Sequence, residues 1–514
     1  MKTIAKYLFY FFFSAVLFTL SFSGYGFEFL IWFSLIPLFT IITASKKKFK
    51  TGLIAGTIIY TSSLIWLVPT ISNYGGLPIV SSFAAIVLLG FYLGIYTGIF
   101  SILFPDTEKK PILSLFLIPA LWTSLDFFSS FLFSGFPWVF AGYSQFKNLS
   151  LVQISSITGV YGITFYIVLI NCALFILLNS AFQKKNLTAP KNIIICLLTA
   201  SITIFIALYG NKNLKNTKQL ISKSEHIKTA LVQANILPEK KHGNNVKSML
   251  EKHFELTKTV TEKFDLAIWP ETAIPYPIFL DNKILYSIDE FAQKYGNLII
   301  GFLDIKNQNS GYILKNRAQL FPLENNQFNF YDKIHLVPFG EYIPLKKYFP
   351  FFSKFIVPSG EFNPGKTNLT FDHNKIRAGV KICFEIIFPG LVKDQVKNGA
   401  NIIINLTNDA WFGKTAGPHQ HLAISVLRAV ENKRTVARCA NTGISAHILP
   451  TGEIISKTGL FETKTIIENV PLIEEKTIYT KYGDFFAYTC TFVLLSHGFL
   501  VYLKRKKNKK GELK

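Results

Sequence analysis

The stretch GVKICFEIIFPG at residues 379–390 contains Cys383, the residue on which most of the interpretation depends. The apolar and β-branched residues before Cys383 are typical of a buried strand, and the Pro-Gly pair that follows indicates a chain turn. Upstream lie WPETA at residues 269–273 and YDKIHLVPFGEYIP at residues 331–344. These segments place Glu271, Lys333 and Cys383 just past the ends of predicted strands, where layered α/β folds gather chemistry.

These three residue types together suit acyl transfer through a thioester. A cysteine attacks an ester as the thiolate, so its thiol proton must be removed. Glu271 is the candidate general base. Attack on an ester creates an oxyanion, which Lys333 and the backbone N–H of Phe384 can stabilise. The positive charge of Lys333 would also favour the thiolate.

Two further glutamates are candidates for a supporting role. Glu341 lies in PFGEYIP, a loop that Pro and Gly make stiff, and it can orient the ammonium group of Lys333. Glu385 lies two residues after Cys383 and can hold the turn that forms the oxyanion site. For each glutamate the alternative is an ordinary surface carboxylate.

Other interpretations of Cys383 remain open from the sequence. A cysteine–histidine pair of the papain type could use His335, His419 or His421, which we interpret instead as packing or substrate-contact residues. A disulfide between Cys383 and Cys439 is the structural alternative. The cysteines and histidines show no spacing typical of a zinc site.

The composition indicates a membrane protein. Half of the 514 residues are hydrophobic, 17% are charged and 50 are Phe. Apolar stretches of about 20 residues, long enough to cross a bilayer, predict about eight spans. These spans are residues 4–23, 27–44, 51–70, 79–104, 111–133, 152–180, 192–210 and 485–503.

The predicted spans divide the chain into three parts. Residues 1–210 form a transmembrane domain with seven spans, residues 211–480 a domain of mixed composition, and residues 481–514 a last span with a basic tail. Within 211–480, strand-like and helix-like patterns alternate, and they include predicted strands at residues 311–321 and 376–383 and a predicted helix at residues 418–433. This alternation predicts a layered α/β domain.

The basic residues behind the net charge of +23 are distributed according to the predicted spans, which argues against a nucleic-acid-binding surface. Lysine clusters follow the second, fourth, sixth and eighth spans, and the alternate short loops are nearly free of basic residues apart from Lys147. This asymmetry is typical of cytoplasmic loops. It predicts both termini in the cytoplasm and the α/β domain outside.

Several motifs resemble the nitrilase, or carbon–nitrogen hydrolase, superfamily. They are WPETA, DKIHLVPFGEYIP, GVKICFE and NLTNDAWFGKTAGPHQH, the last at residues 405–421. The multispan halves and GFPWVFAGYSQ at residues 135–145 resemble one branch of it, the bacterial apolipoprotein N-acyltransferase family. The resemblance implies a four-layer αββα sandwich with a Glu271–Lys333–Cys383 triad supported by Glu341 and Glu385.

The resemblance also implies an activity and partners. The acyl donor is a membrane glycerophospholipid, and the acceptor is the N-terminal amine of a diacylated lipoprotein in the bacterial inner membrane. No metal or organic cofactor is implied. The sequence departs from the family at Phe384, where a Tyr is usual, and at His242, where a Trp is usual.

Hydrophobic residues of the α/β domain are candidate lipid contacts. Trp411 is one, and Phe351 and Phe352 lie in the apolar segment of residues 348–358. With residues 274–280 this segment could form an apolar collar that admits acyl chains.

Two other functions fit parts of the sequence. A membrane-anchored amidase would use the same triad with water as the acceptor, although seven preceding spans are excessive for an anchor. A transporter or assembly protein would use ionisable groups within the membrane, of which Glu28 and Asp126 are the main candidates.

Overall fold

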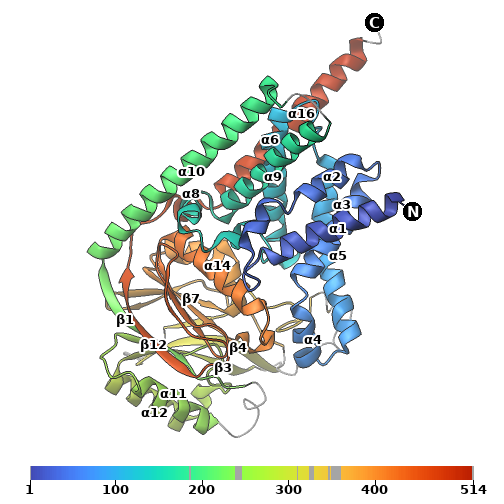
Figure 1. Cartoon of the computed structure of the whole chain (residues 1–514). Helices are drawn as coiled ribbons and strands as arrows, with labels where there is room; N and C mark the ends of the chain where they lie inside the picture. The colour runs from blue at the N-terminus through green and yellow to red at the C-terminus, as the bar shows by residue number, and fades with distance from the viewer. Residues whose placement is uncertain are drawn as a thin grey trace. The chain divides into compact units, whose positions relative to one another are not determined.

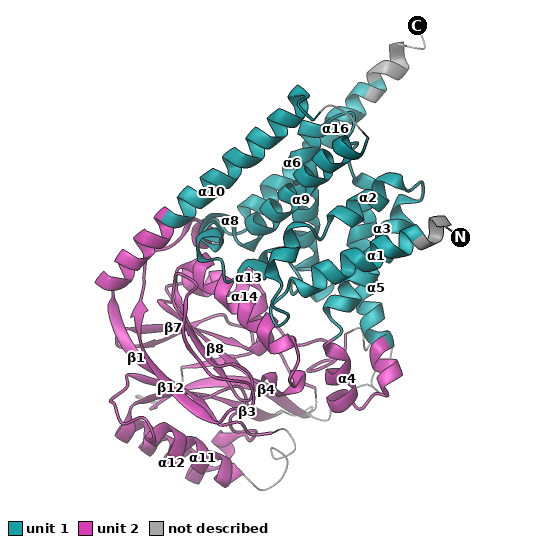
Figure 2. Cartoon of the chain, viewed as in Figure 1, with its two compact units in different colours: residues 1–65, 84–211, 482–514 teal, residues 66–83, 212–481 magenta. Residues whose placement is uncertain are grey.

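The computed structural model describes residues 2–183, 187–237, 246–308, 311–322, 329–344, 346, 348 and 361–511. Within these ranges the chain forms two compact units (Figures 1 and 2). The helical unit comprises residues 1–65, 84–211 and 482–514, and the α/β unit comprises residues 66–83 and 212–481. The predicted sites at His242, Phe351 and Phe352 lie outside the described residues.

The helical unit contains fewer membrane-length helices than the eight spans predicted. Five described helices are long and apolar enough to cross a membrane, or six if the bent pair α3 (Lys48–Ser63) and α4 (Leu67–Gly75) forms one span. The five are α5 (Ile79–Leu103), α6 (Pro111–Ser129), α9 (Val160–Phe182), α10 (Pro190–Lys223) and α16, whose apolar part is Phe485–Lys504. The first two predicted spans instead contain shorter apolar helices, Lys6–Leu20 and Glu28–Ala44.

Small residues set the packing of helices α3 (Lys48–Ser63) and α5. A Cβ atom added to Gly56 would lie 2.9 Å from the Cα of Gly94, and one added to Gly94 would lie 2.8 Å from the backbone nitrogen of Thr57. Side chains are as apolar as lipid tails in such a unit, so close backbone approach contributes much of the association. Larger residues at either glycine would separate the two helices.

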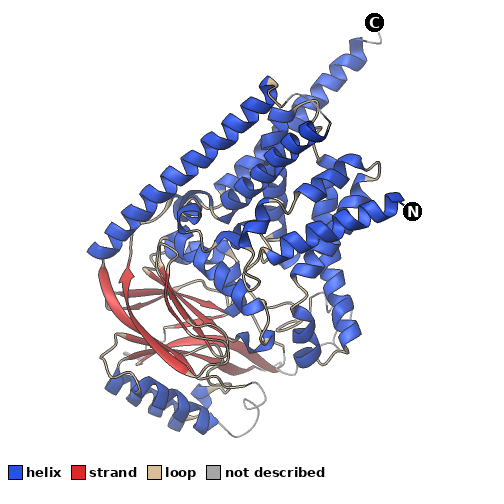
Figure 3. Ribbon diagram, viewed as in Figure 1, coloured by secondary structure: helices blue, strands red, loops and turns tan. Residues whose placement is uncertain are grey.

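The α/β unit is built on two six-stranded sheets (Figure 3). The first sheet has the order β12-β1-β2-β3-β4-β5. Its strands are β1 (Glu225–Gln233), β2 (Leu266–Ile268), β3 (Asn297–Gln308), β4 (Gly311–Phe321), β5 (Phe330–Asp332) and β12 (Lys464–Leu472).

The second sheet has the order β11-β10-β9-β8-β7-β6. Its strands are β6 (Thr370–His373), β7 (Ile376–Ile382), β8 (Ile402–Thr407), β9 (Thr435–Ala440), β10 (Ala446–Ile448) and β11 (Ile454–Lys457). Strands β7, β8 and β9 run parallel. Nearly all of their residues are buried, as expected for strands covered on both faces.

Helices cover the outer faces of both sheets. Helices α11 (Val246–Lys258) and α12 (Asn282–Tyr295) contact the first sheet, and α13 (Pro389–Lys397) and α14 (Gly417–Asn432) contact the second. One apolar cluster draws residues from strands of both sheets and includes Cys383, so it lies between them. The unit is therefore the layered α/β sandwich that the sequence indicates.

Candidate active site

Cys383 occupies a strained turn at the end of β7. Its φ angle is +51°, in the left-handed region that residues other than glycine rarely adopt. The residue opens the 3-10 helix η7 (Cys383–Ile387) and is 8% exposed. Strained conformations of this kind persist only when the surrounding structure holds them, and they cluster at functional sites.

Glu271 follows β2 on a turn that a glycine makes possible. The turn lies against Gly301 of β3, where an added Cβ would meet the carbonyl oxygen of Pro270 at 2.4 Å and the Cα of Glu271 at 2.8 Å. Trp269 is fully buried and anchors the same turn, because its backbone N–H donates to the carbonyl of Ile299 at 2.8 Å. The Glu271 carboxylate is buried and accepts a hydrogen bond from Asn316 Nδ2 at 2.8 Å.

Lys333 lies between two carboxylates. Its Nζ is 2.7 Å from Glu341 Oε1 and 3.4 Å from Glu271 Oε1, and its side chain is 1% exposed. The second carboxylate oxygen of Glu341 accepts from the backbone N–H of Val337 at 2.8 Å. Although burial lowers the pKa of Lys333, the two carboxylates outweigh it and raise that pKa above its ordinary value. Lys333 is therefore a fixed positive charge.

Burial and the Glu271 carboxylate raise the pKa of Cys383, and Lys333 lowers it only in part. The net shift is upward, so the resting thiol is protonated at neutral pH. The sequence suggested that Lys333 would favour the thiolate, and it does, but the other two effects are larger. A thiol in this state needs a base at the moment of attack.

Glu385 holds the turn and the Lys333 loop together. Its Oε1 accepts hydrogen bonds from Tyr331 Oη at 2.7 Å and from the backbone N–H groups of Ile334 and His335 at 2.7 and 3.1 Å. Its Oε2 accepts from the backbone N–H of Ile382 at 2.8 Å. This fully buried carboxylate therefore links the segment that carries Lys333 to the one that carries Cys383.

The remaining residues predicted to support the site or contact lipid differ in how deeply they are buried. Phe384 is buried, and its ring lies 5.2 Å from that of Phe388. Trp411 is half-buried in the 3-10 helix η8 (Asp409–Phe412), with its ring 5.0 Å from that of Tyr74 in α4 (Leu67–Gly75). In the proposed collar, Ile274 and Ile278 are core residues rather than surface ones.

The two cysteines of the α/β unit are both free. Cys439 is buried on β9, with its Sγ 3.1 Å from the carbonyl oxygen of Ile268. Among the histidines, His335 lies with its ring 3.8 Å from that of Phe388, and His421 Nε2 lies 3.2 Å from the carbonyl oxygen of Cys383. Among the described residues, no three His, Cys, Asp or Glu side chains are grouped to hold a metal ion.

The sequence did not indicate several buried polar residues of the site. Asn316 is one, and Lys381 is another: its Nζ donates to Tyr331 Oη at 3.1 Å and to Asn368 Oδ1 at 2.6 Å. Burial lowers the pKa of Lys381 to about 8. Lys381 is fully buried on β7, and a lysine in a largely apolar strand was the available signal.

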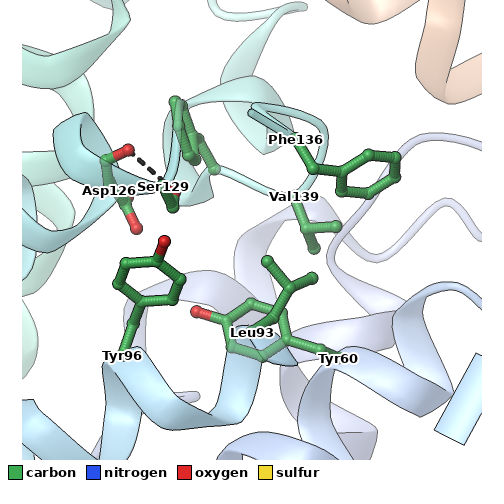
Figure 4. Close-up of a pocket in the computed structure, with 8 residues that line it drawn as sticks. Tyr60, Leu93, Tyr96, Asp126, Ser129, Phe136 and Val139 are labelled. Atoms are coloured by element: carbon green, nitrogen blue, oxygen red, sulfur yellow. Dashed lines mark hydrogen bonds between the residues drawn. The ribbon is translucent and has the colours of Figure 1, made fainter. Parts of the chain in front are cut away.

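The two ionisable residues expected in the helical unit differ in their surroundings. The Glu28 carboxylate pairs with Lys147 Nζ at 2.6 Å. Asp126 is buried and lines a pocket with Tyr60, Tyr96 and Phe136, among others, and the Tyr96 hydroxyl points towards its carboxyl group (Figure 4). Its Oδ2 has no hydrogen-bond partner among the residues that the structure describes.

Comparison with known proteins assigns both parts of the chain to one family. Residues 14–173 match the apolipoprotein N-acyltransferase N-terminal domain, and residues 228–477 match the carbon–nitrogen hydrolase domain. The apolipoprotein N-acyltransferase of Geobacter metallireducens is 34% identical over 93% of this chain and 92% of its own. That of Haemophilus influenzae is 30% identical over 96% and 95%. The chain is thus a multi-pass membrane enzyme that belongs to the apolipoprotein N-acyltransferase family.

Proposed function

We propose that the protein transfers a fatty acyl chain from a membrane glycerophospholipid to the N-terminal α-amino group of a diacylglyceryl-cysteine lipoprotein. The chain passes through a thioester on Cys383. The observation that carries this proposal is the buried charge cluster around Cys383: a fixed cation and two carboxylates, with Lys333 and Glu271 acting electrostatically on the thiol.

In the first step Cys383 is acylated. Glu271 removes the thiol proton as Sγ attacks the ester carbonyl of the donor. Lys333 and the backbone N–H of Phe384 stabilise the oxyanion. The ester C–O bond then breaks, Glu271 returns the proton to the departing alkoxide, and a lysophospholipid leaves.

In the second step the acyl group leaves Cys383. The neutral α-amino group of the acceptor attacks the thioester carbonyl, and Glu271 accepts a proton from the nitrogen. The C–S bond breaks, the sulfur recovers the proton and an amide forms. Cysteine suits this relay because a thioester is more reactive towards amines than an oxygen ester.

The membrane arrangement is part of the same proposal. The shorter apolar helices at Lys6–Leu20 and Glu28–Ala44 would complete about eight spans, with both termini in the cytoplasm. The α/β unit would then face the outer side of the bacterial inner membrane. Its acyl-chain contacts would include Trp411, with Phe351 and Phe352.

A two-stage experiment tests the transfer. Purified protein is loaded with a phospholipid labelled in its acyl chains, freed of excess donor and mixed with a diacylglyceryl-cysteine peptide. We expect the label to move to the peptide amine, and an N-acetylated peptide to receive none. Release of the label as free fatty acid, at equal rates with either peptide, would contradict the proposal and favour a hydrolase.

A further inference from the structure

A second group of buried polar side chains lies beside Cys383, and one of them contacts its main chain. Its members are Asp409 at the start of η8, His421 in the second turn of α14 and Arg438 on β9. All three side chains are fully buried. Burial on this scale is unfavourable for charged groups unless they are paired, so the contacts within the group decide what it does.

Arg438 is the centre of this group. Its Nη2 lies 2.6 Å from Asp409 Oδ2 and 3.1 Å from His421 Nδ1. Burial raises the pKa of Asp409, but Arg438 and His421 outweigh it and lower that pKa to about 2. Asp409 and Arg438 therefore form an ion pair at neutral pH.

His421 is neutral beside this ion pair. Burial and the Arg438 guanidinium lower the pKa of His421, and the Asp409 carboxylate only partly opposes them. A neutral imidazole has one N–H donor and one acceptor nitrogen. Only one of its two ring nitrogens can therefore donate a hydrogen bond.

The contact with Cys383 decides which nitrogen carries the proton. His421 Nε2 lies 3.2 Å from the Cys383 carbonyl oxygen, which can only accept. A proton on Nε2 makes this contact a hydrogen bond and leaves Nδ1 as an acceptor for Arg438. Nδ1 then faces Asp409 Oδ1 without a proton between them, and the Arg438 guanidinium, which contacts both groups, offsets that approach. A proton on Nδ1 would serve Asp409 at 3.0 Å, but would set the Nε2 lone pair against the carbonyl oxygen.

We propose that His421 is a positioning residue for the nucleophile, with its Nε2–H donating to the carbonyl oxygen of Cys383 and Arg438 donating to its Nδ1. The turn at Cys383 has a left-handed backbone and needs such support. Glu385 holds the N–H of Ile382 before the turn, and His421 holds the carbonyl within it. Together they set the directions of Sγ and of the Phe384 N–H.

This role differs from that of a catalytic base. His421 contacts Cys383 at the carbonyl oxygen, and supporting that oxygen requires no transfer of the thiol proton to the imidazole. The inference rests on the proposed role of Cys383 as nucleophile. Its test therefore includes alkylation of Cys383 by iodoacetamide, which requires no acyl transfer.

Two substitutions of similar polarity distinguish the role of Nε2 of His421 from that of Nδ1. The amide of His421→Gln reaches about as far as Nε2, whereas that of His421→Asn reaches only about as far as Nδ1. We expect His421→Gln to keep kcat within about tenfold of the native value. His421→Asn should lose roughly 100-fold in kcat with KM little changed, because a nucleophile displaced by about 1 Å can lose that much.

His447 provides the matched control. It is also a fully buried histidine, and its ring nitrogens contact Thr229 Oγ1 and Ser456 Oγ, each at 2.9 Å. His447→Asn should lower the melting temperature as much as His421→Asn but leave kcat and the alkylation rate of Cys383 unchanged in the folded fraction. Equal kcat values for His421→Asn and His421→Gln, or for His421→Asn and His447→Asn, would overturn the proposal.

A measurement on the native protein covers variants that fail to fold. In protein labelled with 15N-histidine, the nitrogen shifts of His421 distinguish the two neutral tautomers. We expect protonation at Nε2. Protonation at Nδ1 would overturn the assignment whether or not the variants fold.

Discussion

The α/β unit and the helical unit both bury acidic side chains, but they surround them differently. In the α/β unit, Glu271 and Glu341 share Lys333, and Asp409 pairs with Arg438. In the helical unit, none of the residues lining the pocket beside Asp126 carries a positive charge. A buried charge is retained only where an opposite charge or several donors compensate it.

The difference separates chemistry from packing. The paired carboxylates and cations of the α/β unit are placed to move a proton and to stabilise an oxyanion. Asp126 lies instead in a pocket lined by tyrosine hydroxyls, Ser129 and apolar side chains. Substitutions that remove charge should therefore have large effects in the first unit and small effects in the second.

Glu271→Gln should give the largest effect. It removes the proposed base, so acylation of Cys383 should fall by up to about 10⁴-fold. It also removes a negative charge that raises the pKa of Cys383, so the thiolate should form at lower pH than in the native protein. Rates of iodoacetamide alkylation against pH, measured beside rates of acylation, check both directions.

The opposite result would be informative. If the alkylation profile of Glu271→Gln moves to higher pH, the carboxylate does not act on the thiol as a charge. If acylation is unchanged, Glu271 is not the base.

Lys333→Met should follow in size. It removes the cation between Glu271 and Glu341 and the proposed oxyanion partner, so kcat should fall about 10²–10³-fold. Steady-state kinetics measure the fall in kcat, and a thermal melt measures the effect on stability of leaving the two carboxylates without their cation. Lys315→Met is the matched control, because Lys315 pairs with Asp332 on the same sheet at 3.7 Å and should leave kcat within about threefold. Similar losses in both variants would contradict a special role for Lys333.

Glu385→Gln should have a moderate effect. The amide keeps one acceptor oxygen but sets an NH₂ group against the backbone N–H of Ile382, or against those of Ile334 and His335. A hydrogen bond to a charged group contributes about 1.5–3 kcal/mol, so stability should fall by about that amount. Chemical denaturation of the purified protein measures it, and an unchanged midpoint would show that the carboxylate does not hold the turn.

Asp126→Asn should have the smallest effect. The amide has nearly the shape of the carboxyl group, and no cation of the pocket loses a partner. We expect kcat to stay within about threefold of the native value, because a change of about RT in the activation free energy alters a rate by about that factor. A loss beyond tenfold would show that the helical unit uses the ionised carboxylate.

Much of the α/β unit could be predicted from local patterns. Strand β4 was predicted with its observed bounds, Gly311–Phe321, and β7 and α14 were predicted to within a residue at each end. Strand β9 was missed because Thr435–Ala440 contains Arg438, a charge that is neutralised only by residues distant in sequence. Pattern reading cannot detect that compensation.

The same limit applies to the site. Glu271, Lys333 and Cys383 could be found because each follows a strand, and Glu341 because its loop is stiff. Asn316 and Arg438 lie within strands, where the role of a polar side chain depends on the residues that neighbouring elements place beside it. His421 was considered, but its contact with the main chain of Cys383 depends on how α14 packs against η7.

The most direct test of the account is whether Cys383 carries the acyl chain. Native protein, Cys383→Ser and Cys439→Ser are each incubated with acyl-labelled phospholipid without acceptor, and the protein is then treated with hydroxylamine, which cleaves thioesters. We expect hydroxylamine-sensitive label on the native protein and on Cys439→Ser, and none on Cys383→Ser. Such label persisting on Cys383→Ser, or absent from the native protein, would contradict the account.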